Sequence, residues 1–410
     1  AMLSASYYTR LEADLARGQF APQSSLLSGF FCVFAGPQEE RADAIKRRVA
    51  AILATYLEGI SYARLLRTDA QMRDTTSMEW YAQWTRYEDP DTLLTASMSP
   101  AERRAVLIFA SFHCNGYLRQ RAVRKLPDYP ATLPFIALRL WDCVPEVRRE
   151  AAHAFERHLP QATDREVIET LPLFLGRPQR DTDPASLLTL LEPRLNGNRA
   201  LFEQILADPL RRVRQFGITT LRTFLPTRCN EMLSHRLACE PDPYLRRRIF
   251  QTLLDSGQDL GFLYDRLLRD KYPPNRLLAL QSLHRDDPAA GETMARSLLL
   301  DKNARVRYAA QQLVLRHEPA FDLPAFYRGR VGESPLLVLA EVDGSWSSED
   351  TLWIEPFLDH PRPAICRAAM AALMRLDPWR YVSRIRAMLD SPQHGIAQTA
   401  ARLLRRLPLL

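Results

Sequence analysis

A short motif recurs along most of this chain and restricts what the chain can fold into. It begins with an acid or helix-capping residue, often followed by proline. An apolar residue comes five positions after the acid, then an arginine, and a small residue lies four after the apolar one. The best copy is residues 208–217 (DPLRRVRQFG), and the stretches that begin at Asp142 and Asp301 match it. Recurrence at a fixed period is typical of folds built from stacked units.

Ten copies of the motif follow one another. Their apolar positions lie 29 to 32 residues apart, except for intervals of 41 and 25 residues on either side of the poorest copy, which begins at Asp183. A unit of about 30 residues has room for two helices of about 12 residues and two short turns. Its apolar residues recur at helical spacing, and so small a helix pair buries its apolar face only against neighbours. The apolar positions are Leu118, Val147, Leu188, Val213, Leu245, Asn275, Val306, Leu336, Ile365 and Ile396.

The D-P-x-x-x-V-R-x-x-A/G pattern resembles HEAT repeats, especially the short kind in phycobilisome-lyase-like and related bacterial proteins, over residues 99–410. The resemblance implies an all-α, right-handed α-α solenoid (superhelix) of about ten helix pairs. In length and layout the chain is also similar to an uncharacterised group of proteobacterial HEAT-repeat proteins, some of which are linked to type VI secretion effectors. That similarity implies an adaptor, chaperone or immunity protein for a secreted effector. Nothing in the sequence marks a tetrapyrrole site.

Residues 1–98 lack the motif but are predicted to be helical, and we expect them to form an N-terminal helical cap on the solenoid of residues 99–410. Ser99 and Glu102, separated by Pro100, have the spacing of a capping box and predict a helix start. Thr76 and Glu79 predict another. Trp80, Trp84 and Tyr87 follow Thr76 on one helix face; we expect them to pack on the body of the protein, with a partner anchor as the alternative.

An acid at the first motif position and an arginine at the seventh occur together in five copies. Because the two charges tend to be present or absent together, we expect them to be partners. The acid is expected to cap the second helix while its charge pairs with the arginine of its own or the next repeat. We therefore expect Arg214→Ala to lower thermal stability by leaving Asp208 less well paired. This structural ladder comprises Asp142, Arg148, Asp208, Arg214, Glu240, Arg246, Asp270, Arg276, Asp301 and Arg307.

The chain has a net charge of +7, and many of its arginines lie outside this ladder. Several come early in the predicted second helices, which line the concave face of HEAT stacks, and they make a mildly basic surface. We expect it to bind another protein, acidic or extended. A basic groove for nucleic acid is the alternative, although acids such as Glu146, Glu150 and Glu156 dilute its field. The candidate partner-binding residues are Arg121, Arg124, Arg149, Arg211, Arg212, Arg247 and Arg248.

Motifs for catalysis are missing from the sequence. HEAT-fold di-iron hydroxylases hold their metals with several His-Glu dipeptides, whereas this chain has one, His317-Glu318. Neither the GxSxG elbow nor the phosphate-binding GxxxxGK[ST] loop occurs. We expect no enzyme activity, cofactor or metal.

The six cysteines are scattered without a CxxC pair, which suits a reducing compartment. The most apolar run, residues 26–36, is too short for a membrane helix. We expect a cytoplasmic protein that does not contact a membrane, in an oligomeric state that the sequence leaves open.

Overall fold

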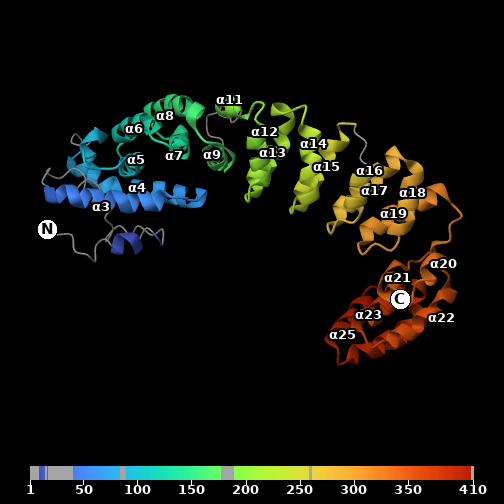
Figure 1. Ribbon diagram of the computed structural model, residues 1–410. Helices are drawn as coiled ribbons and strands as arrows, with labels where there is room; N and C mark the ends of the chain where they lie inside the picture. The colour runs from blue at the N-terminus through green and yellow to red at the C-terminus, as the bar shows by residue number, and fades with distance from the viewer. Residues whose placement is uncertain are drawn as a thin grey trace. The chain divides into compact units, whose positions relative to one another are not determined.

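The computed structural model describes residues 9–13, 16, 40–83, 89–176, 189–257 and 261–407. In these ranges every regular element is helical, and no strand occurs. The fold is therefore all-α, as the spacing of the apolar residues predicts (Figure 1). The chain divides into two compact units, Ala1–Ser256 and Gly257–Leu410.

The N-terminal part of the first unit contains two long helices, α3 (Glu40–Leu57) and α4 (Tyr62–Gln83). A turn at Gly59 joins them, with a φ of 63° that glycine adopts without strain. Helix α4 runs through Thr76, so the helix start predicted there is wrong. The Thr76 hydroxyl donates to the Met72 carbonyl at 2.7 Å, which is a mid-helix bond and not a cap. Trp84 and Tyr87 lie outside the described residues, as does the side chain of Trp80.

The rest of the first unit consists of shorter helices that pack on their neighbours in the chain. Helix α3 packs on α5, and α5 with α6, α7 with α8, α12 with α13 and α14 with α15 form pairs (Figure 1). The α-helices are α5 (Pro100–Ala110), α6 (Gly116–Lys125), α7 (Leu133–Leu138), α8 (Pro145–His158), α9 (Asp164–Gly176), α11 (Glu192–Leu195), α12 (Arg199–Ala207), α13 (Arg211–Phe224), α14 (Cys229–Cys239) and α15 (Pro243–Leu254). Short 3-10 helices are η2 (Pro90–Leu93), η3 (Leu126–Asp128), η4 (Arg139–Trp141), η5 (Leu159–Gln161) and η6 (Thr189–Leu191).

The second unit continues in the same manner, with α16 packed on α17, α18 on α19 and α24 on α25. Its α-helices are α16 (Gly261–Leu268), α17 (Pro273–Asp286), α18 (Pro288–Leu298), α19 (Ala304–His317), α20 (Leu323–Arg328), α21 (Pro335–Glu341), α22 (Thr351–Ile354), α23 (Pro363–Leu376), α24 (Pro378–Ala387) and α25 (His394–Leu404). Its 3-10 helices are η7 (Ser348–Asp350), η8 (Glu355–Asp359) and η9 (Met388–Asp390).

Local sequence explains where many of these helices begin. At α5 the Ser99 hydroxyl accepts the N–H of Glu102, and the Glu102 carboxylate accepts the N–H of Ser99 at 2.7 Å. The predicted capping box is therefore confirmed. Proline occupies the first turn of many helices, where its fixed φ fits and no N–H is needed; α8, α15, α17 and α23 begin in this way.

The motif's apolar positions lie near the start of the second helix of each pair and point inward in most copies. Val147, Val213 and Val306 are fully buried. Leu336 is 44% exposed, so its assignment as an apolar core position is wrong; in the short helix α21 the buried residues are instead Val338 and Leu339. Leu188 lies outside the described residues.

Candidate partner-binding surface

The arginine of each ladder copy binds back to the main chain of its own repeat. The Nη1 of Arg214 donates to the Asp208 carbonyl at 2.9 Å. In the same way Arg148 binds the carbonyl of Asp142, and Arg307 that of Asp301, each at 2.7 Å. Arg246 and Arg276 make the same contact with Glu240 and Asp270. The bond closes the turn before the second helix.

The rest of the guanidinium group reaches the acid of the following repeat. Glu240 and Asp301 therefore meet the arginine of the preceding repeat, and the prediction that an acid pairs with the arginine of its own or the next repeat is wrong for them. Nη2 of Arg214 lies 3.0 Å from Oε1 of Glu240, and Nη2 of Arg276 lies 2.6 Å from Oδ1 of Asp301. Arg307 pairs with a carboxylate outside the predicted ladder, that of Glu341. Arg214, Arg276 and Arg307 therefore bind both the turn of their own repeat and a carboxylate that follows it in the chain.

The ladder acids were expected to cap the second helix, but they bind the turn that comes just before it. Oδ1 of Asp208 accepts the N–H of Leu210, which is the N-cap residue of α13, at 2.7 Å. The acid thus fixes the residue that precedes the helix and does not occupy the N-cap itself. The same bond to the residue two positions on occurs at Asp142, Glu240, Asp270 and Asp301.

Asp142 is the centre of a buried charge cluster that the motif reveals only in part. Arg119 binds its carboxylate through Nε at 3.0 Å and Nη2 at 2.7 Å, while Arg139 and Arg73 approach it at 3.2 and 2.7 Å. Asp69 completes the cluster at 2.5 Å from Arg139. Arg119 follows the apolar position Leu118 as a ladder arginine does, so its role could be predicted from the motif. The motif does not predict the contribution of Asp69, Arg73 and Arg139.

Neighbouring arginines hold two of these acids, Asp142 and Glu240, in the charged form. Burial alone would raise the pKa of Asp142, but the hydrogen bond from Arg119 and the charges of Arg139, Arg119 and Arg73 outweigh it and lower that pKa. Burial likewise opposes the hydrogen bonds from Arg214, Asp242 and Arg236 at Glu240, and the pKa of Glu240 is again lowered. Neither carboxylate is poised to exchange a proton near neutral pH.

Three of the seven arginines proposed for partner binding already have acidic partners. Arg124 pairs with Glu150 at 2.7 Å, and Arg149 pairs with Glu146 at 2.8 Å. Arg211 pairs with Asp242 at 2.9 Å and lies 5.5 Å from the ring centre of Tyr244. Arg121 is half-buried and also interacts with its surroundings.

Three candidates remain available on neighbouring second helices. Arg212 on α13, and Arg247 and Arg248 on α15, are exposed, and their guanidinium groups make no ion pair or hydrogen bond with any residue that the structure describes. Helices α13 and α15 pack against each other. Tyr244, 55% exposed, lies at the start of α15 and adds an aromatic ring near these charges. We call Arg212, Arg247, Arg248 and Tyr244 the arginine surface.

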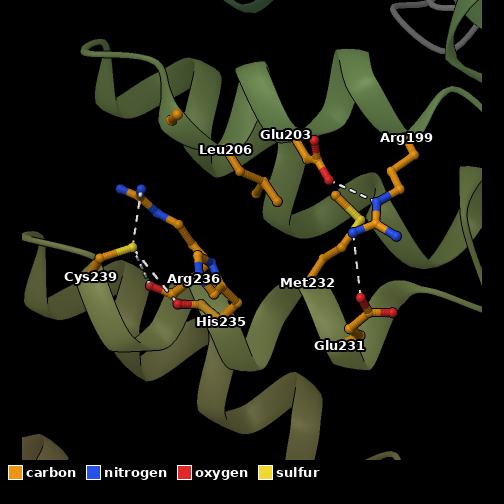
Figure 2. A pocket seen from close by; sticks show the side chains of 9 residues that line it. Arg199, Glu203, Leu206, Glu231, Met232, His235, Arg236 and Cys239 are labelled. Carbon is orange, nitrogen blue, oxygen red and sulfur yellow. Dashed lines mark hydrogen bonds and ion pairs between the residues drawn. The ribbon is translucent and has the colours of Figure 1, made fainter.

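The first helices of the same two pairs enclose a hollow of about 520 Å³ (Figure 2). Leu206 of α12 and Met232 of α14 give it an apolar floor. Along its rim Arg199 lies 2.7 Å from Glu203 and 3.5 Å from Glu231. Arg236 is the second arginine of the lining, so the lining's two positive charges balance its two carboxylates. The hollow therefore suits an apolar side chain of a partner better than a phosphate.

No group of three or more His, Cys, Asp or Glu side chains within the described ranges could hold a metal ion. His317 of the single His-Glu dipeptide faces the ring of His284, with 5.0 Å between ring centres, and its Nδ1 lies 3.9 Å from Glu292. Across the same ranges, no helix is both long and apolar enough to cross a bilayer.

Comparisons with known proteins name no family for this chain. No family model matches it, and no curated protein does. Among solved structures it is similar to a crystal structure described as that of an engineered protein, with 13% sequence identity over 92% of this chain and 98% of that chain. The TM-score of 0.20 is too low to carry an argument about fold or function.

Proposed function

We propose that this chain is a non-enzymatic scaffold or adaptor that binds another protein through the arginine surface. The observation that carries the proposal is a contrast between two sets of arginines. Ladder arginines such as Arg214 are bound on both sides. Arg212, Arg247 and Arg248, by contrast, are exposed and have no acidic partner among the described residues. Exposed arginines near an aromatic ring are typical of interaction hot spots.

The architecture we propose for it is a right-handed α-α solenoid of about ten HEAT-like helix pairs with an N-terminal helical cap. Two features support this. The motif recurs about every 30 residues, and Arg214, Arg276 and Arg307 link their repeats to a following carboxylate by the same geometry. Nearest-neighbour links of this kind are what a stack of repeats requires.

An acidic or extended protein segment fits the arginine surface best. Its three unmatched positive charges would steer such a partner and make association sensitive to salt. The neutral, apolar-floored hollow beside α12 and α14 offers a second contact of a kind that proteins use. An adaptor, chaperone or immunity role toward a secreted bacterial effector, as in type VI secretion, is the narrower form of this proposal and rests on the family resemblance.

Nucleic-acid binding is the second candidate because Tyr244 lies among the arginines, and base stacking beside phosphate contacts uses such a pair. The acids weigh against it. Glu150, Glu146 and Asp242 neutralise three of the seven candidate arginines, which breaks a continuous track for a phosphate backbone.

The test is affinity capture from the native host with the intact chain and with an Arg212/Arg247/Arg248→Glu variant. The matched control is Arg305/Arg316/Arg402→Glu, which makes the same charge change at exposed positions elsewhere. We expect the first variant to lose partners that the intact chain and the control retain, and purified partner to bind the intact chain in a salt-dependent manner. Equal recovery by all three proteins would refute the arginine surface. If random double-stranded DNA shows a salt-sensitive mobility shift that only the first variant loses, the partner is nucleic acid and not protein.

A further inference from the structure

A cavity of about 340 Å³ lies where the turn between α3 and α4 meets the starts of α7 and α9. Glu58 and Tyr62 line it from that turn, Phe135 from α7 and Glu166 from α9, and Arg104 of α5 completes the lining. It is separate from the arginine surface and shares no residue with it. Its volume is at the small end of the range for ligand pockets.

Arg104 enters this cavity without a carboxylate to neutralise it. Its Nη2 donates to the Ala131 carbonyl at 2.9 Å, and the guanidinium carbon lies 5.9 Å from the ring centre of Phe135. Its Nε is buried and has no hydrogen-bond acceptor among the described residues. Burial lowers the pKa of Arg104, and nearby acids only partly oppose that effect. An unmatched, half-buried cation is costly, so the position calls for an anionic group.

The backbone that holds Arg104 is itself strained. Ala131 has a φ of 55°, and it is the one non-glycine residue with positive φ in the described part of the chain. This conformation costs about 1 kcal/mol for an L-residue, and it belongs to the residue whose carbonyl binds Arg104. Strain of this kind is found where a site must be held in one geometry.

Of the three acids around the cavity, two have partners for their carboxylates and one does not. Glu166 is already bound by His158 at 2.9 Å and by the N–H of Thr163 at 2.8 Å, and Glu169 pairs with Arg165 at 2.7 Å. Glu58 is exposed at the rim and forms no ion pair with a described residue. The lining therefore offers one unmatched positive charge inside and one unmatched negative charge at the mouth.

We propose that this cavity binds a small zwitterion, with its carboxylate on Arg104 and its ammonium on Glu58. A purely anionic ligand would be repelled by three carboxylates, and a purely cationic one would be repelled by Arg104 and leave it unmatched. Arginine binds a carboxylate with two parallel hydrogen bonds. The apolar wall, which includes Leu57, Ile60 and Leu65, selects an apolar side chain. An apolar free amino acid has these three features.

Isothermal titration calorimetry of the full chain with L-leucine and with L-phenylalanine tests the site. We expect saturable binding of at least one of them. The matching N-acetyl amino acid, which lacks the ammonium, and the matching amide, which lacks the carboxylate, are each expected to bind at least about tenfold more weakly. No saturable heat with either amino acid, or equal binding of the N-acetyl form, would overturn the proposal.

Two variants locate the binding on the protein. Arg104→Gln and Glu58→Gln are each expected to weaken the affinity by about tenfold or more, whereas Glu146→Gln, an exposed carboxylate outside the cavity, leaves it unchanged. Because Glu58 is exposed, its variant keeps the fold even if Arg104→Gln does not, and circular dichroism checks both. Wild-type affinity in Glu58→Gln places the ammonium elsewhere and refutes the proposal.

Discussion

Arg214 joins two consecutive helix pairs by holding the Asp208 carbonyl of its own repeat and the buried Glu240 carboxylate of the next. The bonds are 2.9 Å from Nη1 to the carbonyl and 3.0 Å from Nη2 to Oε1 of Glu240. Both charged groups are almost fully buried. An ion pair of this kind adds little net stability over an apolar pair of the same shape, but breaking it leaves a buried charge behind.

The first prediction is that Arg214→Ala destabilises the first unit. Glu240, not Asp208, is the carboxylate that loses its partner, and Arg236 remains at 2.7 Å to hold part of its charge. We expect a cost of about 2 kcal/mol, which lowers the midpoint of thermal unfolding by about 5 °C. The control is Arg212→Ala on the same helix, which is exposed and should leave the midpoint unchanged. A wild-type midpoint in Arg214→Ala would show that the bridge does not stabilise the first unit.

The second prediction concerns the stability of the fold at low pH. Burial alone would raise the pKa of Glu166, but the hydrogen bonds from His158 and from the N–H of Thr163 outweigh it and lower that pKa to about 2. Because the folded pKa lies below the unfolded one, the resulting stability of about 3 kcal/mol is fully present above pH of about 4.5 and is lost as the pH falls toward 2.

We therefore expect Glu166→Gln to be less stable than wild type at pH 7 and to lose less stability between pH 7 and pH 3. Thermal unfolding at the two pH values measures this. Glu169→Gln, on the same helix but exposed, should lose as much as wild type. Parallel pH profiles for wild type and Glu166→Gln would mean that Glu166 is not the group that titrates.

Helix starts show how far local sequence predicts this fold. Ser99 and Thr76 have the same capping-box spacing, yet only Ser99 caps a helix. Thr76 is fully buried inside α4, where its hydroxyl returns to a main-chain carbonyl of the preceding turn. Packing of α4 decides this outcome, and a four-residue pattern holds no information about packing.

The charge network shows a similar division. Arg119 and Asp142 occupy motif positions in successive copies, so their pairing was predictable in kind. Asp69, however, belongs to a helix without the motif and reaches Arg139 across 70 residues of sequence. The cavity beside Arg104 was unpredictable for the same reason, because its lining comes from four separate parts of the chain.

The third prediction tests the polar occupant of an apolar position. Asn275 is fully buried, and its Nδ2 donates to Oδ2 of Asp270 at 2.9 Å. Although the motif favours an apolar residue here, we expect Asn275→Val to lower stability by about 1 kcal/mol, because it removes a donor from a buried carboxylate. Chemical unfolding measures the change, and Gln281→Val, exposed on the same helix, is the control, with a change within about 0.5 kcal/mol. A more stable Asn275→Val would show that the apolar motif outweighs the hydrogen bond.

The last prediction concerns a close approach between two helices of the second unit. Gly291 of α18 faces the backbone of α17, and a Cβ at this position would lie 2.4 Å from the Cα of His284 and 2.9 Å from its nitrogen. Backbone atoms cannot move aside as a flexible side chain does. The two helices must therefore separate, and packing along their interface is lost.

We expect Gly291→Ala to cost about 2 kcal/mol, even though alanine favours a helix interior over glycine by about 1 kcal/mol. The measurement is the free energy of unfolding by denaturant. Gly344→Ala is the control, since a Cβ there meets nothing within 4 Å. If Gly291→Ala were as stable as wild type or more so, helix propensity would dominate and α17 and α18 would not be in the close contact described here.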